Sequence, residues 1–467
     1  MSDARTIHFV SLGCAKNRVD TEVMLGVAGV TGFVHVDDPA EAEVIVVNTC
    51  GFIGPAKEES VDTILEMAEL KSQGRCEQLV VAGCLSQRYP EQLAKEMPEV
   101  DHFLGSSDML KLGPVLKREA GRMLVGNPAA YTMRATDPRV ITQRGHSAYL
   151  KIAEGCNRSC SFCTIPSFRG KQRSRSIEDL VAEATRLADA GVVELNLISQ
   201  DTIAYGRDRD ERPTLAGLVE ALGEVEGLRW IRLHYLYPER LTDPLLALLA
   251  DHPKVLPYID MPLQHAATDM LKRMRRGHGG KRLYDLVDRV RTQVPDLVFR
   301  TSFIVGHPGE TQAEFDDLLK FVEWAEFDHV GVFLYSKEEG TRSGEMDAEV
   351  LDEEIMRRRR ALMRLQRPIS RERLRSRIGT ELEVLVDGIS DESDFLLEGR
   401  WWGQAPDVDG KIYLANGAAQ PGEIRRALVS DAADYDLVAD LLQADGSWDA
   451  PPGAERPLRP KVKLRTI

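Results

Sequence analysis

The chain has 467 residues, of which 43% are hydrophobic and 29% charged, and its formal net charge is −14. This composition is typical of a folded protein of about two to four domains. It excludes disordered and disulfide-scaffold classes, because only seven cysteines are present. No apolar run approaches the roughly 18 residues of a membrane-spanning helix, and the N-terminus lacks the apolar core of a signal peptide. We therefore expect a cytoplasmic protein without a membrane partner, in which reduced, clustered cysteines indicate metal or redox chemistry.

Residues 1–130 are predicted to form a doubly wound, flavodoxin-like α/β domain. The runs IHFVSLG, EVIVVNT and QLVVAG are typical of buried parallel strands, with amphipathic stretches at 19–27 and 58–70. A cysteine follows each strand: Cys14, Cys50 and Cys84. Because the carboxyl ends of parallel strands lie at one edge of a sheet, we expect these thiols to converge there. Cys76 lies in a polar stretch away from a strand end and is not predicted to be a ligand.

A connector at 105–145 leads to a second α/β unit, predicted at 142–377. Six further apolar runs read as strands: AYLKIA, VVELNLIS, RWIRLHYL, LPYIDMP, VFRTSFIV and HVGVFLY. Helical patterns fall beside them at 177–190, 214–226, 243–251, 281–294 and 311–326. Six strand–helix units predict a partial (β/α)6 barrel, with its active face at the carboxyl ends of the strands. Between 357 and 377 stand ten arginines on a predicted helix, which we expect to brace the C-terminal region rather than to meet ribosomal RNA.

The pattern changes at 378–445 to short strands without helices, which predict a small all-β barrel. Between Ile378 and Asp440 there are 14 acidic and four basic residues, a balance of −10. Within this region Trp401 and Trp402 are interpreted either as a seat for a protein loop or as packing of the barrel. A basic tail is predicted at 446–467.

Cys156, Cys160 and Cys163 directly follow the first predicted strand of the central barrel, with C-x3-C-x2-C spacing. Three thiolates can hold three irons of a cubane 4Fe-4S cluster and leave the fourth iron open, as in catalytic metal sites. The alternative is a structural zinc site, which requires a fourth ligand at short range. His146 is the only nearby candidate for that ligand.

With Phe162 as the aromatic of a C-x3-C-x-aromatic-C motif at the first strand of a partial barrel, the chain resembles the radical S-adenosylmethionine (SAM) enzymes. The second set, SLGCAKN, VVNTC and VAGC, together with a terminal barrel similar to the TRAM domain, narrows the resemblance to the methylthiotransferases. It covers roughly residues 6–440. The resemblance implies two 4Fe-4S clusters, one auxiliary cluster on the N-terminal cysteines and one radical SAM cluster on the central ones. It also implies two uses of SAM, as methyl donor and as radical source.

The resemblance further implies SAM contacts at the ends of the barrel strands. The candidates are Gln200 and Asp201 after the second strand, Gln264 after the fourth, and Gly306 and Glu310 in the GHPGE loop after the fifth. Two other groups are weaker candidates: Arg173 and Arg175, which could pair with a carboxylate, and Lys16, Asn17 and Asn48, which could tune the auxiliary cluster by hydrogen bonds.

Two subfamilies of methylthiotransferase compete for the substrate. One modifies adenosines of tRNA, and its TRAM barrel must be basic to neutralise phosphates. The other, the RimO type, modifies the β-carbon of an aspartate in ribosomal protein uS12, a basic partner that suits an acidic barrel. The net charge of −10 between Ile378 and Asp440, together with the run GQAPDVDG, favours the uS12 type. A non-catalytic iron–sulfur sensor is the third hypothesis. We also expect a sulfur donor, a one-electron reductant such as flavodoxin, and a monomeric chain.

Overall fold

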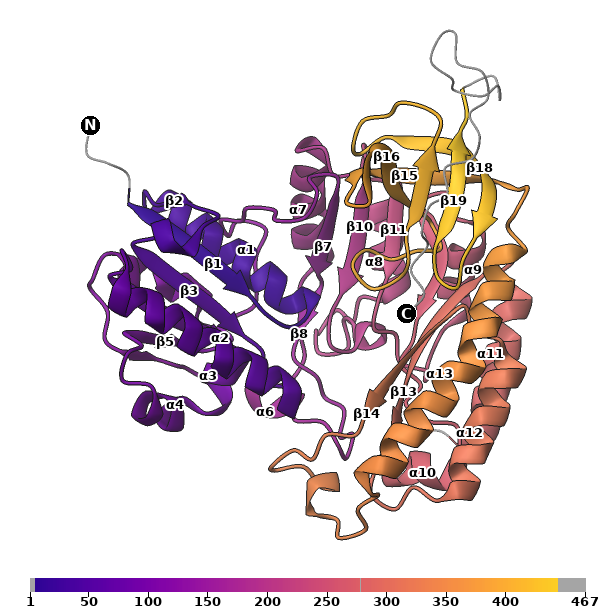
Figure 1. The fold of residues 1–467 in the computed structure, drawn as a ribbon, viewed down its shortest axis with the longest axis horizontal. Helices are drawn as coiled ribbons and strands as arrows, with labels where there is room; N and C mark the ends of the chain where they lie inside the picture. Colours follow the sequence, from indigo (N-terminus) through magenta and orange to yellow (C-terminus); the bar gives the residue numbers. More distant parts are fainter. Residues whose placement is uncertain (1–4, 278, 444–467) are drawn as a thin grey trace.

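The computed structural model describes residues 5–277 and 279–443, in which the chain forms two six-stranded parallel sheets and a closed five-stranded barrel (Figure 1). The predicted fold class is thereby confirmed. The tail predicted at 446–467 lies outside the described residues. Within these described ranges, no helix combines the length and the apolarity needed to cross a membrane.

The N-terminal sheet has the strand order β2-β1-β3-β4-β5-β6, and every pairing in it is parallel. The strands are β1 (Thr6–Ser11), β2 (Val34–His35), β3 (Val44–Thr49), β4 (Gln78–Gly83), β5 (His102–Leu104) and β6 (Met123–Leu124). The helices are α1 (Ala15–Val30), α2 (Gly54–Gln73), α3 (Cys84–Arg88), α4 (Pro90–Glu96) and α5 (Leu112–Leu116), with 3-10 turns η1 (Pro39–Glu41) and η2 (Met109–Lys111).

Helices cover both faces of this sheet because its central strands are apolar on both sides. In β3, Val44 and Val46 pack in one core with α1 and α5, whereas Ile45 and Val47 pack in another with α2 and α4. Successive side chains of a strand point to opposite faces of the sheet, so a strand that is apolar throughout is buried on both faces. This is the doubly wound arrangement, and it places the segments that carry the cysteines at the carboxyl edge of the sheet.

The second sheet has the order β14-β13-β12-β11-β10-β7 and is an open, parallel partial barrel. Its strands are β7 (Ser147–Lys151), β10 (Glu194–Ile198), β11 (Trp230–Leu233), β12 (Val255–Asp260), β13 (Val298–Val305) and β14 (His329–Leu334). Two further short strands, β8 (Ala153–Glu154) and β9 (Arg173–Ser174), pair antiparallel outside this sheet. The helices are α6 (Ile165–Arg169), α7 (Ile177–Asp189), α8 (Leu215–Gly223), α9 (Asp243–Asp251), α10 (Thr268–Arg273), α11 (Gly280–Gln293), α12 (Gln312–Ala325) and α13 (Asp352–Arg375), with 3-10 turns η3 (Thr202–Ala204) and η4 (Ser343–Glu345).

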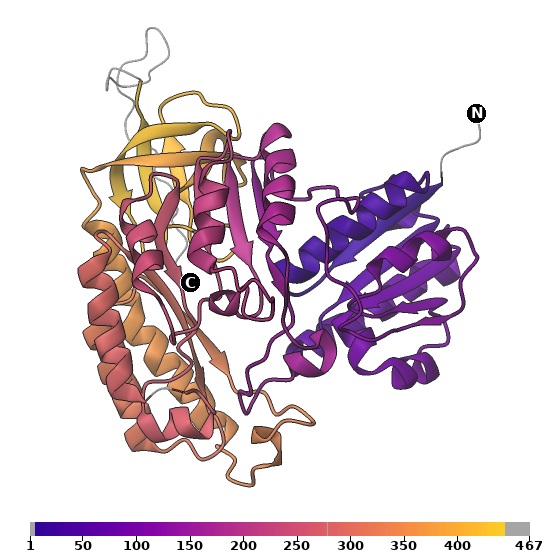
Figure 2. The ribbon, with the colours of Figure 1, turned by 180° about the vertical axis from the view of Figure 1, so that it is seen from behind.

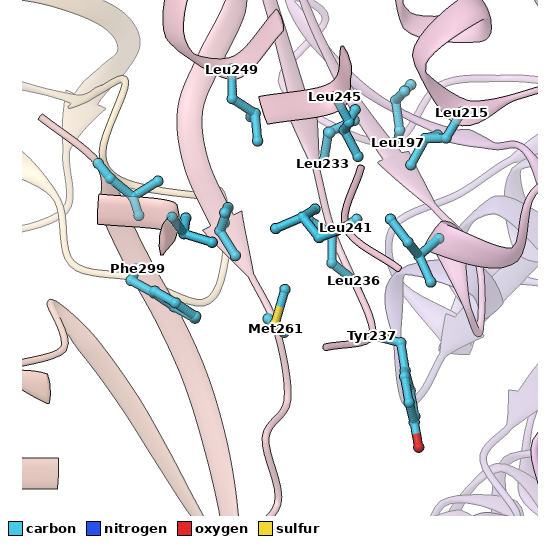
Figure 3. Close-up of a cluster of buried hydrophobic side chains, with 14 of the residues drawn as sticks. Leu197, Leu215, Leu233, Leu236, Tyr237, Leu241, Leu245, Leu249, Met261 and Phe299 are labelled. Carbon is cyan, nitrogen blue, oxygen red and sulfur yellow. The ribbon is translucent and has the colours of Figure 1, made fainter. Parts of the chain in front are cut away.

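Leucines of the outer helices pack against the strands and form the core of this unit (Figure 3). Leu245 and Leu249 of α9 meet Leu233 of β11 there, and Tyr237 lies at the margin of the cluster with its hydroxyl pointing away (Figure 3). The sequence predicted one strand over AYLKIA, but the structure divides it into β7 and β8. Residues 153–154 leave the parallel sheet to pair antiparallel with β9, which positions the loop that carries the three central cysteines.

The C-terminal barrel has the order β15-β16-β17-β19-β18. Its strands are β15 (Glu381–Ser390), β16 (Ser393–Trp401), β17 (Ile412–Ala415), β18 (Ile424–Ala432) and β19 (Leu437–Leu441). It packs on Trp230 and Val298, which begin β11 and β13, and therefore closes the amino end of the central barrel, opposite the active face (Figures 1 and 2). Trp401 is only 2% exposed and contacts the partly buried Trp402 edge to face, so Trp401 packs the barrel.

Part of the acidity of this barrel is used within the chain. Asp434 binds Arg367 and Arg371 of α13, which confirms that the arginine-rich helix braces the barrel. Asp409 binds Arg300 of β13, and other acidic residues of the barrel bind Arg18, Arg144 and Lys411. The net charge of the barrel therefore overstates the acidic surface that it offers to a partner.

Candidate functional site

The three N-terminal cysteines follow β1, β3 and β4, which are neighbouring strands. Their loops approach closely: a Cβ atom added to Gly13 would lie 3.1 Å from the Cys50 sulfur and 2.8 Å from its Cβ. Gly13 also has a φ of +88°, which a residue with a side chain rarely adopts. The conformation before Cys14 thus requires glycine on two grounds, and it brings Cys14 beside Cys50.

Two buried asparagines hold these loops in place. The Asn17 amide donates hydrogen bonds to the carbonyls of Leu12 and Thr49, at 3.0 and 2.9 Å. Asn48 in turn donates to the Asn17 carbonyl at 2.8 Å. These bonds tie the residue before Cys50 to the helix that follows Cys14, so the asparagines fix the spacing between the thiols.

The third thiol, Cys84, is contacted by a side chain of the central unit. Arg169, at the end of α6, places its Nε and Nη2 atoms 3.2 and 3.1 Å from the Cys84 sulfur. The same guanidinium binds Asp20 of α1 at 2.7 Å and approaches Glu154 of β8 at 3.4 Å. Since Arg169 stands six positions after Cys163, one buried cation joins the N-terminal thiols to the loop of the central ones.

Burial strongly favours the protonated form of these thiols. It raises the pKa of Cys84 to about 12, although Arg169 opposes the shift, and it also raises the pKa of Cys50. In the central triplet, burial raises the pKa of Cys156 to about 11 and that of Cys163 to about 12. Thiols in such surroundings become thiolates only when a bound cation stabilises the charge, as iron does.

The central cysteines lie beside two arginines that stack on one tyrosine. The guanidinium carbons of Arg158 and Arg276 lie 3.6 and 3.9 Å from the centroid of the Tyr237 ring. Arg276 approaches the Cys160 sulfur at 3.6 Å, and the backbone N–H of Arg158 donates to the Cys156 sulfur at 3.4 Å. Positive charge and an N–H donor at the sulfurs suit the negative charge that thiolate ligands bring.

A polar cavity of about 200 Å³ lies next to Cys156. Arg158, Gln172 and Asp201 line it, and each carries a buried atom without a hydrogen-bond partner among the described residues: Arg158 Nη2, Gln172 Oε1 and Asp201 Oδ1. Buried polar atoms are normally paired, so these three unpaired atoms mark the cavity as a candidate position for a polar ligand. Gln200 nearby donates to Glu154 at 2.7 Å, and its Oε1 is likewise without a partner.

The other residues predicted to contact SAM lie at the same end of the barrel. Gln264 has a φ of +72° and pairs through its backbone with Phe303. Gly306 has a φ of +83°, and its N–H donates a hydrogen bond to the Glu310 carboxylate within the loop. Glu310 is buried and also binds Arg358 and His265, so its carboxylate oxygens are engaged within the chain. The five SAM contacts stay predictions, and for Glu310 the visible function is to fix the GHPGE loop.

Other candidates have structural partners. His146 lies at the start of β7 and binds Asp387 of the C-terminal barrel at 2.9 Å, so its own contact is not with the cysteines. Arg175 is paired with Asp179 and Glu183. Cys76 is buried in the apolar core beside α2. Within residues 5–277 and 279–443, no group of three His, Cys, Asp or Glu side chains is arranged to hold a single metal ion, and the six cysteines stay predicted cluster ligands.

Three family profiles match the chain in the same order as its three units. They are the uncharacterized protein family UPF0004 at residues 6–105, the Radical SAM superfamily at 150–322 and the TRAM domain at 378–442. A protein of Sorangium cellulosum called "Ribosomal protein uS12 methylthiotransferase RimO" is 62% identical, over 97% of this chain and 94% of its own length. The chain belongs to the RimO family of methylthiotransferases. It is therefore a radical SAM transferase, and SAM and 4Fe-4S clusters are the cofactors of its family.

Two more RimO relatives match almost as fully. The proteins from Myxococcus xanthus and Anaeromyxobacter sp. are each 50% identical, over 94% and 96% of this chain and 92% and 96% of their own lengths. Among solved structures, the radical SAM methyltransferase TsrM from Kitasatospora setae aligns with a TM-score of 0.53 at 16% identity, covering 73% of this chain and 77% of TsrM. This likeness shows a shared fold.

Two residues at the site were missed or undervalued by sequence reasoning. Arg169 was not singled out from the sequence, although its place at the end of a helix that begins just after Cys163 is a usable signal. Tyr235, two residues beyond the end of β11, has a φ of +58° and lies against Lys16. Nothing in the sequence pairs these two, since 219 positions separate them.

Proposed function

We propose that this chain methylthiolates the β-carbon of an aspartate residue of ribosomal protein uS12. The observation that carries the proposal is the contact of Arg169 with Cys84, because it places the N-terminal thiols against the loop of the central triplet. A reaction that joins a sulfur group to a carbon radical requires both centres to reach one substrate atom. The near-complete match to RimO relatives supports the same activity.

In this proposal Cys14, Cys50 and Cys84 hold an auxiliary 4Fe-4S cluster, and Cys156, Cys160 and Cys163 hold a second one. When bound, the clusters would supply the electron that cleaves SAM and the site of the transferred sulfur. Arg158, Gln172 and Asp201 would bind the polar groups of SAM in the cavity beside Cys156. Arg276 and Arg169 would offset the negative charge of the ligands.

The choice of uS12 over tRNA follows from charge. The turn between β15 and β16 carries exposed Asp391, Glu392 and Asp394 beside Phe395, which is 96% exposed. This surface repels phosphates and attracts a basic protein. We expect the chain to act in the cytoplasm as a monomer, with a separate sulfur donor and a one-electron reductant such as flavodoxin.

The test is an anaerobic turnover experiment. The chain is reconstituted with iron and sulfide and given reductant, SAM and a peptide with the uS12 target loop. We expect the peptide to gain the mass of one methylthio group in place of one hydrogen, with formation of 5′-deoxyadenosine. Cys160→Ala removes a ligand of the radical cluster and should abolish both products. Cys76→Ala is the matched control, because this thiol is buried away from both sites.

The competing activities give different results. A methylthio group on an adenosine of tRNA, with none on the peptide, would overturn the aspartate assignment. Two intact clusters with neither product would favour the non-catalytic sensor instead.

A further inference from the structure

Lys16 is a buried cation for which the structure records no hydrogen bond or ion pair to another described residue. It is the second residue of α1, two positions after Cys14, and only 6% of it is exposed. Its ammonium nitrogen lies 2.9 Å from the centroid of the Tyr235 ring, so it points from the cysteine edge of the N-terminal sheet toward the end of β11. Lys16 thus stands between the two units that the proposed reaction must bring together.

The environment of Lys16 contrasts with that of the other buried lysine beside it. Lys151 is about as buried as Lys16, and its ammonium group binds the carboxylates of Asp20 and Glu154. Lysine is rarely buried unless it is paired. The ring of Tyr235 supplies a cation–π contact, and such a contact stabilises a buried ammonium ion by less than its burial costs.

The nearby carboxylates of the chain are already committed. Asp260 accepts from the Tyr235 N–H, lies 3.3 Å from His234 and is ion-paired with Arg300. Glu154 is bonded by Lys151 and Gln200. The nearby carboxylates among the described residues therefore have other partners, and Lys16 lies at a point flanked by the exposed Cys14 and the half-buried Tyr235.

We propose that Lys16 binds the side-chain carboxylate of the substrate aspartate and thereby selects aspartate over its amide. This inference rests on the proposed function and deepens it. A carboxylate held at Lys16 places the β-carbon one bond away, near Cys14 on one side and the end of the barrel strand on the other. An asparagine in the same place would leave the buried ammonium without its counter-charge.

The test measures binding of two target-loop peptides, identical except for aspartate or asparagine at the modified position. The reconstituted holoenzyme and its variants Lys16→Gln, Lys16→Arg and Lys117→Gln are compared by fluorescence anisotropy. We expect the wild type to prefer the aspartate peptide by about tenfold or more, as for a charged hydrogen bond. Lys16→Gln should abolish this preference and Lys16→Arg should retain part of it. Lys117 is exposed and distant in the chain, so Lys117→Gln should behave as wild type.

A second arm separates the substrate carboxylate from that of SAM. SAM binding, and 5′-deoxyadenosine formed without peptide, should be unchanged in Lys16→Gln. If SAM binding falls and the peptide preference stays, Lys16 serves the cofactor and the inference is wrong. A wild type that binds both peptides equally would also overturn it, without recourse to any variant. If the wild type leaves the aspartate peptide unmodified in the turnover experiment, the proposed function fails, and the inference fails with it.

Discussion

At the scale of single residues, buried arginines join different parts of the chain at this site. Arg169 contacts one thiol, one carboxylate of α1 and one of β8, all from different parts of the chain. Burial penalises each of these groups alone, and the pairing offsets that penalty. Glu154 shows this compensation: burial raises its pKa, but the charges of Lys151 and Arg169 outweigh burial and lower the pKa to about 2.

Arg169→Gln should weaken retention of the auxiliary cluster. Groups that orient a metal ligand typically contribute about 10- to 100-fold to metal affinity, so we expect a loss of this size. The measurement is the rate of iron release to a chelator in a background in which Cys156, Cys160 and Cys163 are alanine, which isolates the N-terminal site. Arg173→Gln is the matched control, because Arg173 bonds backbone carbonyls and no thiol. Equal release from both variants would contradict the prediction.

The position of the N-terminal cysteines at one edge of the sheet was predictable because each follows a strong apolar strand, and the edge where parallel strands end is set by topology. The sequence could not predict the partners of Arg169 or Lys16. Their contacts depend on how two separately folded units pack, and no local pattern records that packing. The GHPGE loop shows the same limit: Glu310 was predicted from the sequence as a SAM contact, which stays a prediction, whereas its partner Arg358 comes from α13.

At the scale of elements, the turn between β15 and β16 is an exposed, acidic part of the C-terminal barrel. Two other acidic residues of the barrel, Asp434 and Asp409, are paired with arginines outside it. Ile389 and Phe395, exposed at 65% and 96%, flank the acidic turn. Exposed apolar side chains among like charges are typical of a protein-binding rim.

Neutralising this turn should slow docking of intact uS12. In the variant Asp391→Asn, Glu392→Gln, Asp394→Asn, we expect a higher KM for uS12 with unchanged kcat, and a weaker dependence on salt, because rim charges act on association. The KM for the short target peptide should not change. The measurement is initial rate against uS12 concentration at two ionic strengths.

A control with the same charge change uses Asp62→Asn, Glu66→Gln and Glu69→Gln on α2, where all three are exposed. It should resemble wild type with both substrates. If it raises the KM for uS12 as much as the turn variant does, the effect is one of net charge, and the turn has no special role.

Elements with strong periodicity were predicted almost to the residue, as at 243–251 for α9. The strand β19 was missed because LVADL mixes polar and apolar residues, and it becomes a strand through its pairing with β17 and β18. The strands β2 and β6 have two residues each, too few for any sequence pattern. Short elements are determined by the sheet they join.

At the scale of the whole molecule, function depends on how the N-terminal unit sits against the central one. Besides the pairs of Asp20 with Arg169 and Lys151, buried ion pairs bridge them at two further places. Arg139 of the connector binds Glu22 of α1 and Glu183 of α7. On the far side, Glu338 after β14 binds Lys57 of α2 and Arg88 of α3. These contacts lie outside the thiol loops, so they can be altered without touching a predicted ligand.

Glu338→Gln should uncouple the two halves of the reaction. Removing this buried carboxylate leaves Lys57 and Arg88 without their counter-charge, at a cost of about 3 kcal/mol to the contact between the units. Cleavage of SAM needs only the central unit and should continue. Transfer of the methylthio group needs the two cysteine sites correctly placed relative to each other, so the rate of this transfer should fall. We therefore expect more 5′-deoxyadenosine per methylthiolated peptide than in wild type, measured in the same anaerobic reaction. Glu349→Gln is the matched control, since Glu349 is exposed and pairs only with Lys337 among the contacts recorded for it. An unchanged ratio in Glu338→Gln, with intact clusters, would show that this contact does not set the alignment of the two units.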